Sequence, residues 1–142
     1  MKISTKGRYG LRILLDLARN DGEEPRMIAD ICKAQNLSEK YVGRLILKLR
    51  NAGMLRSVRG ARGGYKLKRM PKHITLLEII ETMEGAISIV DCVSCPAKCK
   101  NSPRCAARQI WSELNAKLRA ALEEITLQDV LDRQEEFSDY CI

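Results

Sequence analysis

The sequence predicts a mainly α-helical fold with one small β-hairpin. Apolar residues recur at helical spacing along most of the chain, and two short alternating segments flank a glycine-rich turn. Breaks that contain proline, glycine or asparagine separate the helical stretches. The chain has 142 residues, of which 45% are hydrophobic and 30% charged, which is the balance of a globular protein with a real core.

The first half of the chain predicts three helices. Residues 4–20 begin with Ser4, a good N-cap residue, and then carry apolar residues at helical spacing. Residues 27–35 predict a short second helix, and Ser38 can cap a third helix over residues 39–53. The third helix has an apolar stripe, and its other face is basic, with Lys40, Arg44, Lys48 and Arg50.

The second half predicts a hairpin and three further helices. Residues 54–69 alternate around the glycine-rich stretch 60–64, which is typical of a two-stranded hairpin. A fourth helix can begin at Thr75, and the cysteine-rich segment after it contains two prolines and predicts a loop. A long helix is expected over residues 106–124, with an apolar stripe of Ile110, Leu114, Leu118 and Leu122, and a shorter helix capped by Thr126 follows it.

The charge is unevenly distributed along the chain. The net charge is +7, and residues 40–72 are rich in Lys and Arg and contain no Asp or Glu. The tail from Glu123 onward is acidic. A basic block of this kind indicates a polyanion partner, for which nucleic acid is the first candidate, although a solvated basic face would have the same composition.

Two short helices joined by a tight turn, the second of them basic, and a following hairpin together predict a winged helix-turn-helix. The major groove of duplex DNA admits an α-helix, and a basic hairpin can lie against the backbone or enter the minor groove. A phosphate-binding enzyme loop is excluded for the glycine-rich tip, because the Gly-Lys-Ser/Thr ending is missing. The residues expected to face DNA are Ser38, Lys40, Tyr41 and Arg44 on the helix and Arg59 and Arg62 on the wing.

Four of the six cysteines lie close together in the pattern Cys92-x2-Cys95-x3-Cys99-x5-Cys105. No apolar run is long enough for a membrane span and no signal-type segment opens the chain, so we expect a cytoplasmic protein. Disulfides are rare in the cytosol, which favours metal or redox chemistry for these thiols. Their spacing alone leaves a zinc site, an iron–sulfur cluster and bare redox thiols open.

Four stretches carry a resemblance to a known family: ISTKGRYGL, LSEKYV, LRNAGMLRSVRGARGGY and IWSELNAKLRAALEEITLQDV. They resemble the Rrf-two family of bacterial winged-helix regulators, essentially end to end. The resemblance implies a homodimer that binds a roughly two-fold symmetric operator in double-stranded DNA, usually as a repressor. It also implies three parts: a winged helix-turn-helix DNA-binding domain at 1–84, a cysteine-rich cluster-binding loop at 85–105, and a dimerisation helix with a C-terminal segment at 106–142.

The resemblance favours an iron–sulfur cluster over the other cysteine chemistries. Cys92, Cys99 and Cys105 match three cysteines that hold a two-iron (2Fe-2S) cluster in IscR-like members. Those members take a histidine as fourth ligand at the position of Arg108, and we expect Cys95 to fill this vacancy. An all-cysteine site would resemble a ferredoxin-type cluster. The implied function is a regulator of iron–sulfur cluster biogenesis genes whose operator binding responds to the cluster.

Two other functions stay open as alternatives. The opening residues and the end of the chain resemble CymR-like members, which regulate cysteine metabolism together with cysteine synthase, and the terminal Ile142 could dock in that enzyme. CymR-like chains generally lack the cysteine loop, so residues 92–105 favour the iron–sulfur interpretation. The other alternative is a zinc or thiol redox-sensing regulator. A single histidine and no nucleophile motif argue against an enzyme.

Overall fold

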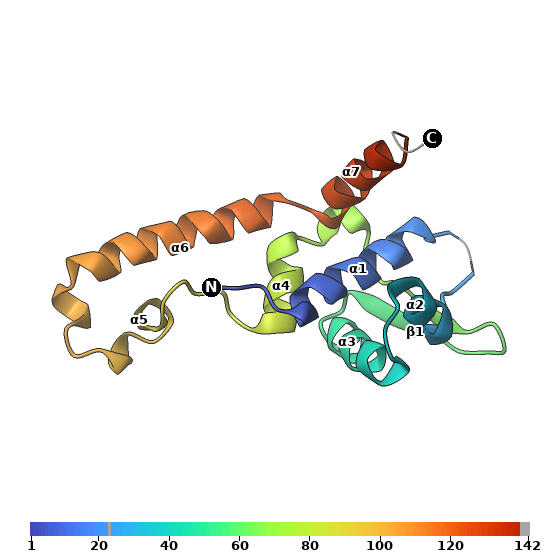
Figure 1. Ribbon diagram of the computed structural model, residues 1–142, viewed down its shortest axis with the longest axis horizontal. Coiled ribbons are helices and arrows are strands. Elements are labelled where there is room, and N and C mark those ends of the chain that lie inside the picture. The colour runs from blue at the N-terminus through green and yellow to red at the C-terminus, as the bar shows by residue number, and fades with distance from the viewer. Residues whose placement is uncertain (23, 140–142) are drawn as a thin grey trace.

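The computed structural model describes residues 1–22 and 24–139, and these form a mostly helical protein with one two-stranded sheet (Figure 1). This confirms the fold class expected from the sequence. The elements of the N-terminal part are α1 (Thr5–Arg19), α2 (Ile28–Gln35), α3 (Glu39–Asn51), β1 (Leu55–Val58), β2 (Gly64–Leu67) and α4 (Leu76–Glu84). The remaining helices are α5 (Asp91–Ser94), α6 (Ala106–Glu124) and α7 (Leu127–Asp139), with short 3-10 turns at Pro71–His73, Pro96–Lys98 and Ser102–Arg104.

Helix α1 packs closely against α4 because it has glycines at the contact. A Cβ atom on Gly7 would lie 2.7 Å from a carboxylate oxygen of Glu84, and one on Gly10 would lie 2.8 Å from the side chain of Met83. The same Glu84 oxygen accepts hydrogen bonds from the Ser4 and Gly7 backbone N–H groups and from the Ser4 hydroxyl. Glu84 therefore satisfies free donors at the start of α1 from a different helix.

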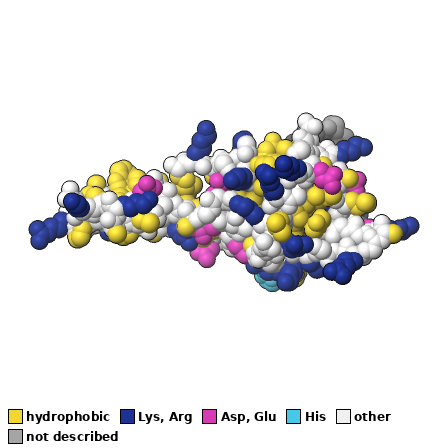
Figure 2. Space-filling model, turned by 90° about the horizontal axis from the view of Figure 1, so that it is seen from below, with side chains coloured by type: hydrophobic (Ala, Val, Ile, Leu, Met, Phe, Trp, Pro, Cys, Tyr) yellow, Lys and Arg dark blue, Asp and Glu magenta, His cyan; other side chains and the backbone are white. Residues whose placement is uncertain are grey.

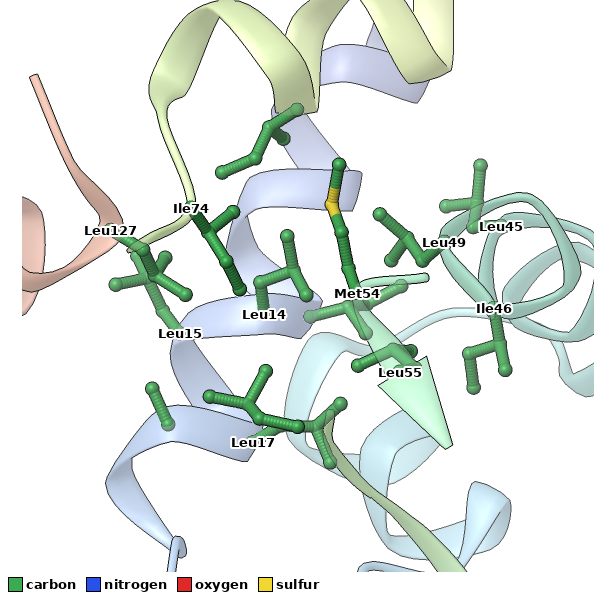
Figure 3. Packing of buried hydrophobic residues seen from close by; sticks show 14 of the residues in the cluster. Leu14, Leu15, Leu17, Leu45, Ile46, Leu49, Met54, Leu55, Ile74 and Leu127 are labelled. Carbon is green, nitrogen blue, oxygen red and sulfur yellow. The ribbon is translucent and has the colours of Figure 1, made fainter. Parts of the chain in front are cut away.

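The core lies between α1, α3, β1 and the first turn of α7 (Figure 3). Leu14 of α1, Leu49 of α3 and Met54 are completely buried, as are Ile74 and Leu127. The apolar stripe expected on the third helix is confirmed, since all four of its members are buried: Val42, Leu45, Ile46 and Leu49. Burial of large aliphatic side chains of this kind contributes about 1.5–3 kcal/mol each and holds the helix-turn-helix as one unit.

The chain returns to the body of the protein after the long helix. Thr126 forms an antiparallel bridge with Thr75, in which the Leu76 N–H donates to the Ile125 carbonyl and the Leu127 N–H donates to the Ile74 carbonyl, both at 2.8 Å. Leu127 then enters the same core cluster as the residues of α1 and α3. As a result α7 packs onto the body of the protein, to which α6 returns from the far end of the arm (Figure 1).

The cysteine-rich segment is more ordered than a simple loop. It contains one short helix, α5, and two 3-10 turns. Both of its prolines are compatible with this structure, because each lies in the first turn of a 3-10 element, where no backbone N–H is needed. Together with the start of α6, this segment forms an arm that projects from the globular body (Figure 1). Within the described residues, no helix is long and apolar enough to cross a membrane.

Candidate functional site

The N-terminus of α3 is built as an exposed, basic helix end. The Ser38 hydroxyl accepts a hydrogen bond from the Tyr41 N–H at 3.2 Å, so Ser38 is the N-cap that the sequence predicts. Ser38, Lys40 and Arg44 are exposed, while the opposite face of the helix is buried in the core. Side chains at the beginning of such a helix are those that can reach the base edges in a major groove.

Tyr41 lies differently from its neighbours. Its side chain is half-buried, and its ring meets the ring of Tyr9 edge to face with the centroids 6.2 Å apart. Its hydroxyl donates to the Thr5 hydroxyl at 3.3 Å. Tyr41 thus connects α3 to α1, and a contact between its hydroxyl and DNA would have to compete with the Thr5 bond. The guanidinium carbon of Arg12 lies over the other ring, 5.2 Å from the Tyr9 centroid.

The wing is a regular antiparallel hairpin with Leu55 opposite Leu67 and Val58 opposite Gly64. It rests on the segment before α2, because Arg26 and Tyr65 exchange both backbone hydrogen bonds, at 3.0 and 2.8 Å. A Cβ on Gly64 would lie only 2.2 Å from the Arg26 carbonyl oxygen, which explains the glycine at this position. The wing is therefore attached to the helix-turn-helix at its base.

Arg59 and Arg62 are both exposed at the wing tip. Arg62 forms an ion pair with Glu24 at 2.9 Å, in which the two side chains are 82% and 67% exposed. An ion pair this exposed contributes little to stability, so a phosphate could take the place of Glu24. Figure 2 views the molecule from the side of α3, and Lys and Arg side chains are spread over the globular body in this view. Acidic side chains are fewer on this face (Figure 2).

The four clustered cysteines occupy the arm. Cys92 lies in α5, Cys95 and Cys99 border the next 3-10 turn, and Cys105 is the N-cap of α6. All four are free thiols, with Cys95 and Cys99 exposed and Cys92 and Cys105 half-buried. Among the residues that the structure describes, no three Cys, His, Asp or Glu side chains are grouped so that they could hold a metal ion.

The donor set suits an iron–sulfur cluster in type and number, since four thiols lie within one short segment and none is used in a disulfide. Their arrangement in the arm does not yet form a site, so the segment would have to close for three or four sulfurs to meet. His73, the single histidine of the chain, is exposed in the 3-10 turn before α4, far from the cysteines in sequence.

Helix α6 connects the arm to the body through polar contacts. The spacing of apolar residues in its sequence did not predict them. Asn115 is buried, and its side chain accepts from the Ile89 N–H at 3.0 Å and donates to the Ile87 carbonyl. Arg119 forms an ion pair with Glu81 of α4. Partial burial opposes ionisation of Glu81, but the hydrogen bonds from Arg119 and the Ile87 N–H outweigh it and lower the pKa of this carboxyl.

The apolar stripe predicted on the long helix has two different halves. Leu118 and Leu122 pack against Leu77 and Ile80 of the body. Further along the arm Ile110, Trp111 and Leu114 remain 52%, 41% and 44% exposed. Hydrophobic side chains are also visible on the surface of the arm in Figure 2. Large apolar side chains that are exposed side by side are typical of an interaction surface.

Residues 3–133 match the family model of Rrf2, described as an iron-dependent transcriptional regulator. The chain is 42% identical over 130 residues to the HTH-type transcriptional regulator CymR of Bacillus subtilis, covering 92% of this chain and 89% of that protein. The solved structure of CymR, the global cysteine regulator of B. subtilis, superposes with a TM-score of 0.77 at 41% identity, covering 94% of this chain and 98% of the other.

A second solved structure, IscR of T. potens, superposes equally well, with a TM-score of 0.77 at 37% identity and coverage of 96% of this chain and 90% of the other. The exposed recognition helix, the basic wing and the long helix of this chain thus occur in a protein whose relatives are transcriptional regulators and not enzymes. The chain belongs to the Rrf2 family of DNA-binding transcriptional regulators.

Proposed function

We propose that this regulator, acting as a repressor, binds operator DNA in a manner that depends on an iron–sulfur cluster held by Cys92, Cys95, Cys99 and Cys105. The observation that supports this proposal is the set of four free thiols within the arm, two of them exposed, at the N-terminus of α6. Soft thiolate donors in this number suit a cluster, and an IscR-named relative has the same fold. When bound, a 2Fe-2S cluster would supply a redox-active and oxygen-sensitive group.

The cysteine segment can change shape at low cost. Apart from Ser102, none of the residues 91–105 is buried, so closure would disturb little apolar packing. Arg108 of α6 donates a hydrogen bond to the Cys92 carbonyl, so a displacement of α5 on closure would be transmitted to the start of α6. The state of the loop is in this way coupled to the orientation of α6.

DNA recognition in this proposal uses two copies of the chain. Ile110, Trp111 and Leu114 form an exposed apolar strip on α6 that a second α6 would cover. Two recognition helices held by such a pairing would enter successive major grooves, about 34 Å apart on one face of the duplex. Ser38, Lys40 and Arg44 would approach base edges and phosphates, and Arg59 and Arg62 would contact the flanking backbone. Tyr41 would support the helix start from behind.

A second candidate function is a regulator of cysteine metabolism that acts with cysteine synthase. It is favoured by the 42% identity to CymR of B. subtilis and by the structural match to that global cysteine regulator. The residue expected to dock in the enzyme, Ile142, lies outside the described residues. Binding of purified cysteine synthase that disappears when Ile142 is deleted would support this function, and absence of binding would exclude it.

The iron–sulfur proposal is tested on protein purified without oxygen. We expect visible absorption from thiolate-to-iron charge transfer, with iron and acid-labile sulfide in equal amounts. Cys92→Ser, Cys99→Ser and Cys105→Ser should each abolish the absorption, and Cys95→Ser should alter or abolish it. Cys32→Ser is the matched control, because Cys32 packs against the core in α2. A colourless protein that contains zinc, or one without metal, would contradict the proposal.

Genes of iron–sulfur cluster biogenesis are the targets we propose for this regulator. Sequencing of genomic fragments retained by the cluster-containing protein would test this part of the proposal separately. Recovery of promoters of cluster assembly genes is the expected result. Recovery of cysteine-uptake or cysteine-biosynthesis promoters instead would favour the second candidate function.

A further inference from the structure

Leu47 is an apolar side chain on the exposed face of the recognition helix α3. It is 48% exposed, whereas the other aliphatic side chains of this helix are at most 2% exposed: Val42, Leu45, Ile46 and Leu49. At about 100° of rotation per residue, position 47 points away from the middle of that buried stripe. The core of the protein therefore does not use Leu47, and its side chain is available to a partner of α3.

The basic side chains on either side of Leu47 are held by the protein itself. The Lys48 ammonium group donates to a backbone carbonyl of α4 at 3.4 Å, and Arg50 donates to a serine hydroxyl of β1 at 3.3 Å. These two contacts direct the long side chains toward α4 and toward the wing. Neither of them lies over Leu47, so the surface between them is apolar at this point.

The residue one turn before Leu47 is a glycine. A side chain on an α-helix leans toward the N-terminus, so that of Leu47 extends toward residues 43 and 44. Among the described residues, a Cβ on Gly43 would meet only the Ile28 side chain, at an ordinary contact distance of 3.7 Å. Packing does not require glycine here, and glycine inside a helix is destabilising relative to alanine. On the surface, its effect is to leave Leu47 uncovered beside Arg44.

The surface around Leu47 is basic. Lys40 and Arg44 lie on the same face of α3, about two turns and one turn nearer its start, and both are exposed. Residues 40–72 contain no Asp or Glu. An apolar group within such a surface suits a partner that is anionic outside and has an apolar group within reach. In the major groove of duplex DNA, the 5-methyl group of thymine is the apolar group that a side chain can contact.

We propose that Leu47 is a specificity-determining residue that contacts the 5-methyl group of a thymine in the major groove. This inference rests on the proposed use of α3 to read the operator, and it adds a base to the sequence that α3 reads. Three residues of helix, a rise of about 4.5 Å, separate Leu47 from Arg44, and base pairs are about 3.4 Å apart. The thymine therefore lies within about two base pairs of the position that Arg44 contacts.

Replacement of thymine by uracil tests the proposal on the full chain. Uracil lacks the 5-methyl group and keeps every hydrogen-bonding group of thymine, so the replacement removes an apolar contact alone. Each thymine of a duplex that the protein selects from a random pool is replaced in turn, and fluorescence anisotropy gives the dissociation constant. We expect a loss of about fourfold at one thymine in each half-site, as for one buried methyl group, and little change at the others.

Leu47→Ala should bind the thymine and uracil duplexes equally, because the side chain that contacts the methyl group is missing. Alanine favours a helix and position 47 lies outside the core, so this variant should fold. Phe137→Ala is the control, because Phe137 on α7 is also apolar and is 73% exposed. This variant should keep the fourfold difference. The comparison of the two bases on the unsubstituted protein needs no variant.

Two results would overturn the role of Leu47. One is equal affinity of the unsubstituted protein for the thymine duplex and for every uracil duplex. The other is a uracil effect that persists in Leu47→Ala, which would assign the methyl contact to another residue. Both results leave operator binding intact, since the selected duplex is still bound. Failure of the unsubstituted protein to select any duplex would instead contradict the proposed function itself.

Discussion

The Nε atom of Arg108 lies 2.9 Å from the backbone carbonyl oxygen of Cys92 and donates a hydrogen bond to it. This bond connects the first turn of α6 with α5, the helix that contains Cys92. Arg108 stands at the position where the family resemblance places a histidine ligand. In this chain the Arg108 side chain binds the backbone of the cysteine segment instead, and its guanidinium group cannot serve as a metal ligand.

Replacement of Arg108 by alanine should loosen the cysteine segment. The bond is partly shielded from water, so its loss should cost about 1 kcal/mol of local stability and raise the exchange rates of the amides in residues 92–95 about fivefold. Hydrogen exchange read by mass spectrometry measures this change. Arg104→Ala, an exposed arginine in the same segment, should leave those rates unchanged. Equal rates in the Arg108 variant would show that the bond does not hold the segment.

Substitution on the exposed strip of α6 should separate the two copies of the chain. Leu114→Glu places a charge next to Ile110 and Trp111 in this strip, where a partner helix would have to bury it. Sedimentation equilibrium should show the mass of one chain for this variant and of two chains for the unsubstituted protein. Lys117→Gln changes the charge of α6 by the same amount at an exposed position and should remain dimeric. A monomeric unsubstituted protein would contradict the proposed pairing.

The wing should contribute to DNA affinity by pairing its arginines with phosphates. Arg59→Ala should weaken binding to a duplex selected by the protein from a random pool. It should also reduce the slope of log K against log salt concentration by about 0.9 for each phosphate that the variant no longer neutralises. Fluorescence anisotropy at several salt concentrations measures both quantities. Arg133→Ala, on α7, removes the same charge and should change neither the affinity nor the slope. An unchanged slope for Arg59→Ala would show that Arg59 does not contact a phosphate.

The carboxylate of Glu84 should make stability depend on pH. The Ser4 hydroxyl, together with the Ser4 and Gly7 N–H groups, lowers the pKa of Glu84 below its ordinary value of 4.5, although partial burial opposes this. A carboxyl whose pKa is lower in the folded state stabilises the fold above pH 4.5, and this contribution is lost as the pH falls through the lowered pKa.

Glu84→Gln should therefore reduce the free energy of unfolding by about 0.5 kcal/mol at pH 7, since solvent screens this exposed carboxylate, and the difference from the unsubstituted protein should shrink below pH 4.5. Urea unfolding between pH 7 and pH 3 measures the difference. Glu123→Gln, at an exposed position on α6, is the control and should show no such trend. A constant difference across this pH range would mean that Glu84 stabilises the protein by packing alone.

Most of the fold could be predicted from the sequence because its helices carry strong local signals. Ser4, Ser38 and Thr75 all cap the helices for which they were expected, since each side-chain oxygen accepts a backbone N–H in the first turn. The buried stripe of α3 also follows from its 3.6-residue period. Periodicity and caps depend only on neighbours in the chain.

Contacts between distant segments could not be predicted in this way. Asn115 is buried through bonds to the backbone of residues 87 and 89, and Glu84 binds Ser4, the N-cap of α1, which lies 80 positions earlier in the chain. Nothing in the local pattern around either residue distinguishes it from an exposed polar side chain. Apolar spacing likewise predicts one stripe on α6, but it cannot tell that Leu118 faces the body while Leu114 lies on the free arm.

The candidate site was predicted in parts. Lys40, Arg44, Arg59 and Arg62 are exposed on the helix end and the wing tip, as DNA binding would require. Tyr41 has a second role against Tyr9 that its position in the sequence did not indicate.

In the proposed mechanism, occupancy of the cysteine segment by a cluster controls the affinity of the protein for DNA. The most direct measurement is the affinity of one anaerobic preparation for its selected duplex, by fluorescence anisotropy, before and after the iron is removed by a chelator. We predict that the dissociation constant changes at least about tenfold and that Cys92→Ala equals the chelated protein, with a coupling of ordinary allosteric size. An identical dissociation constant in all three samples would show that the cysteine segment does not control DNA binding.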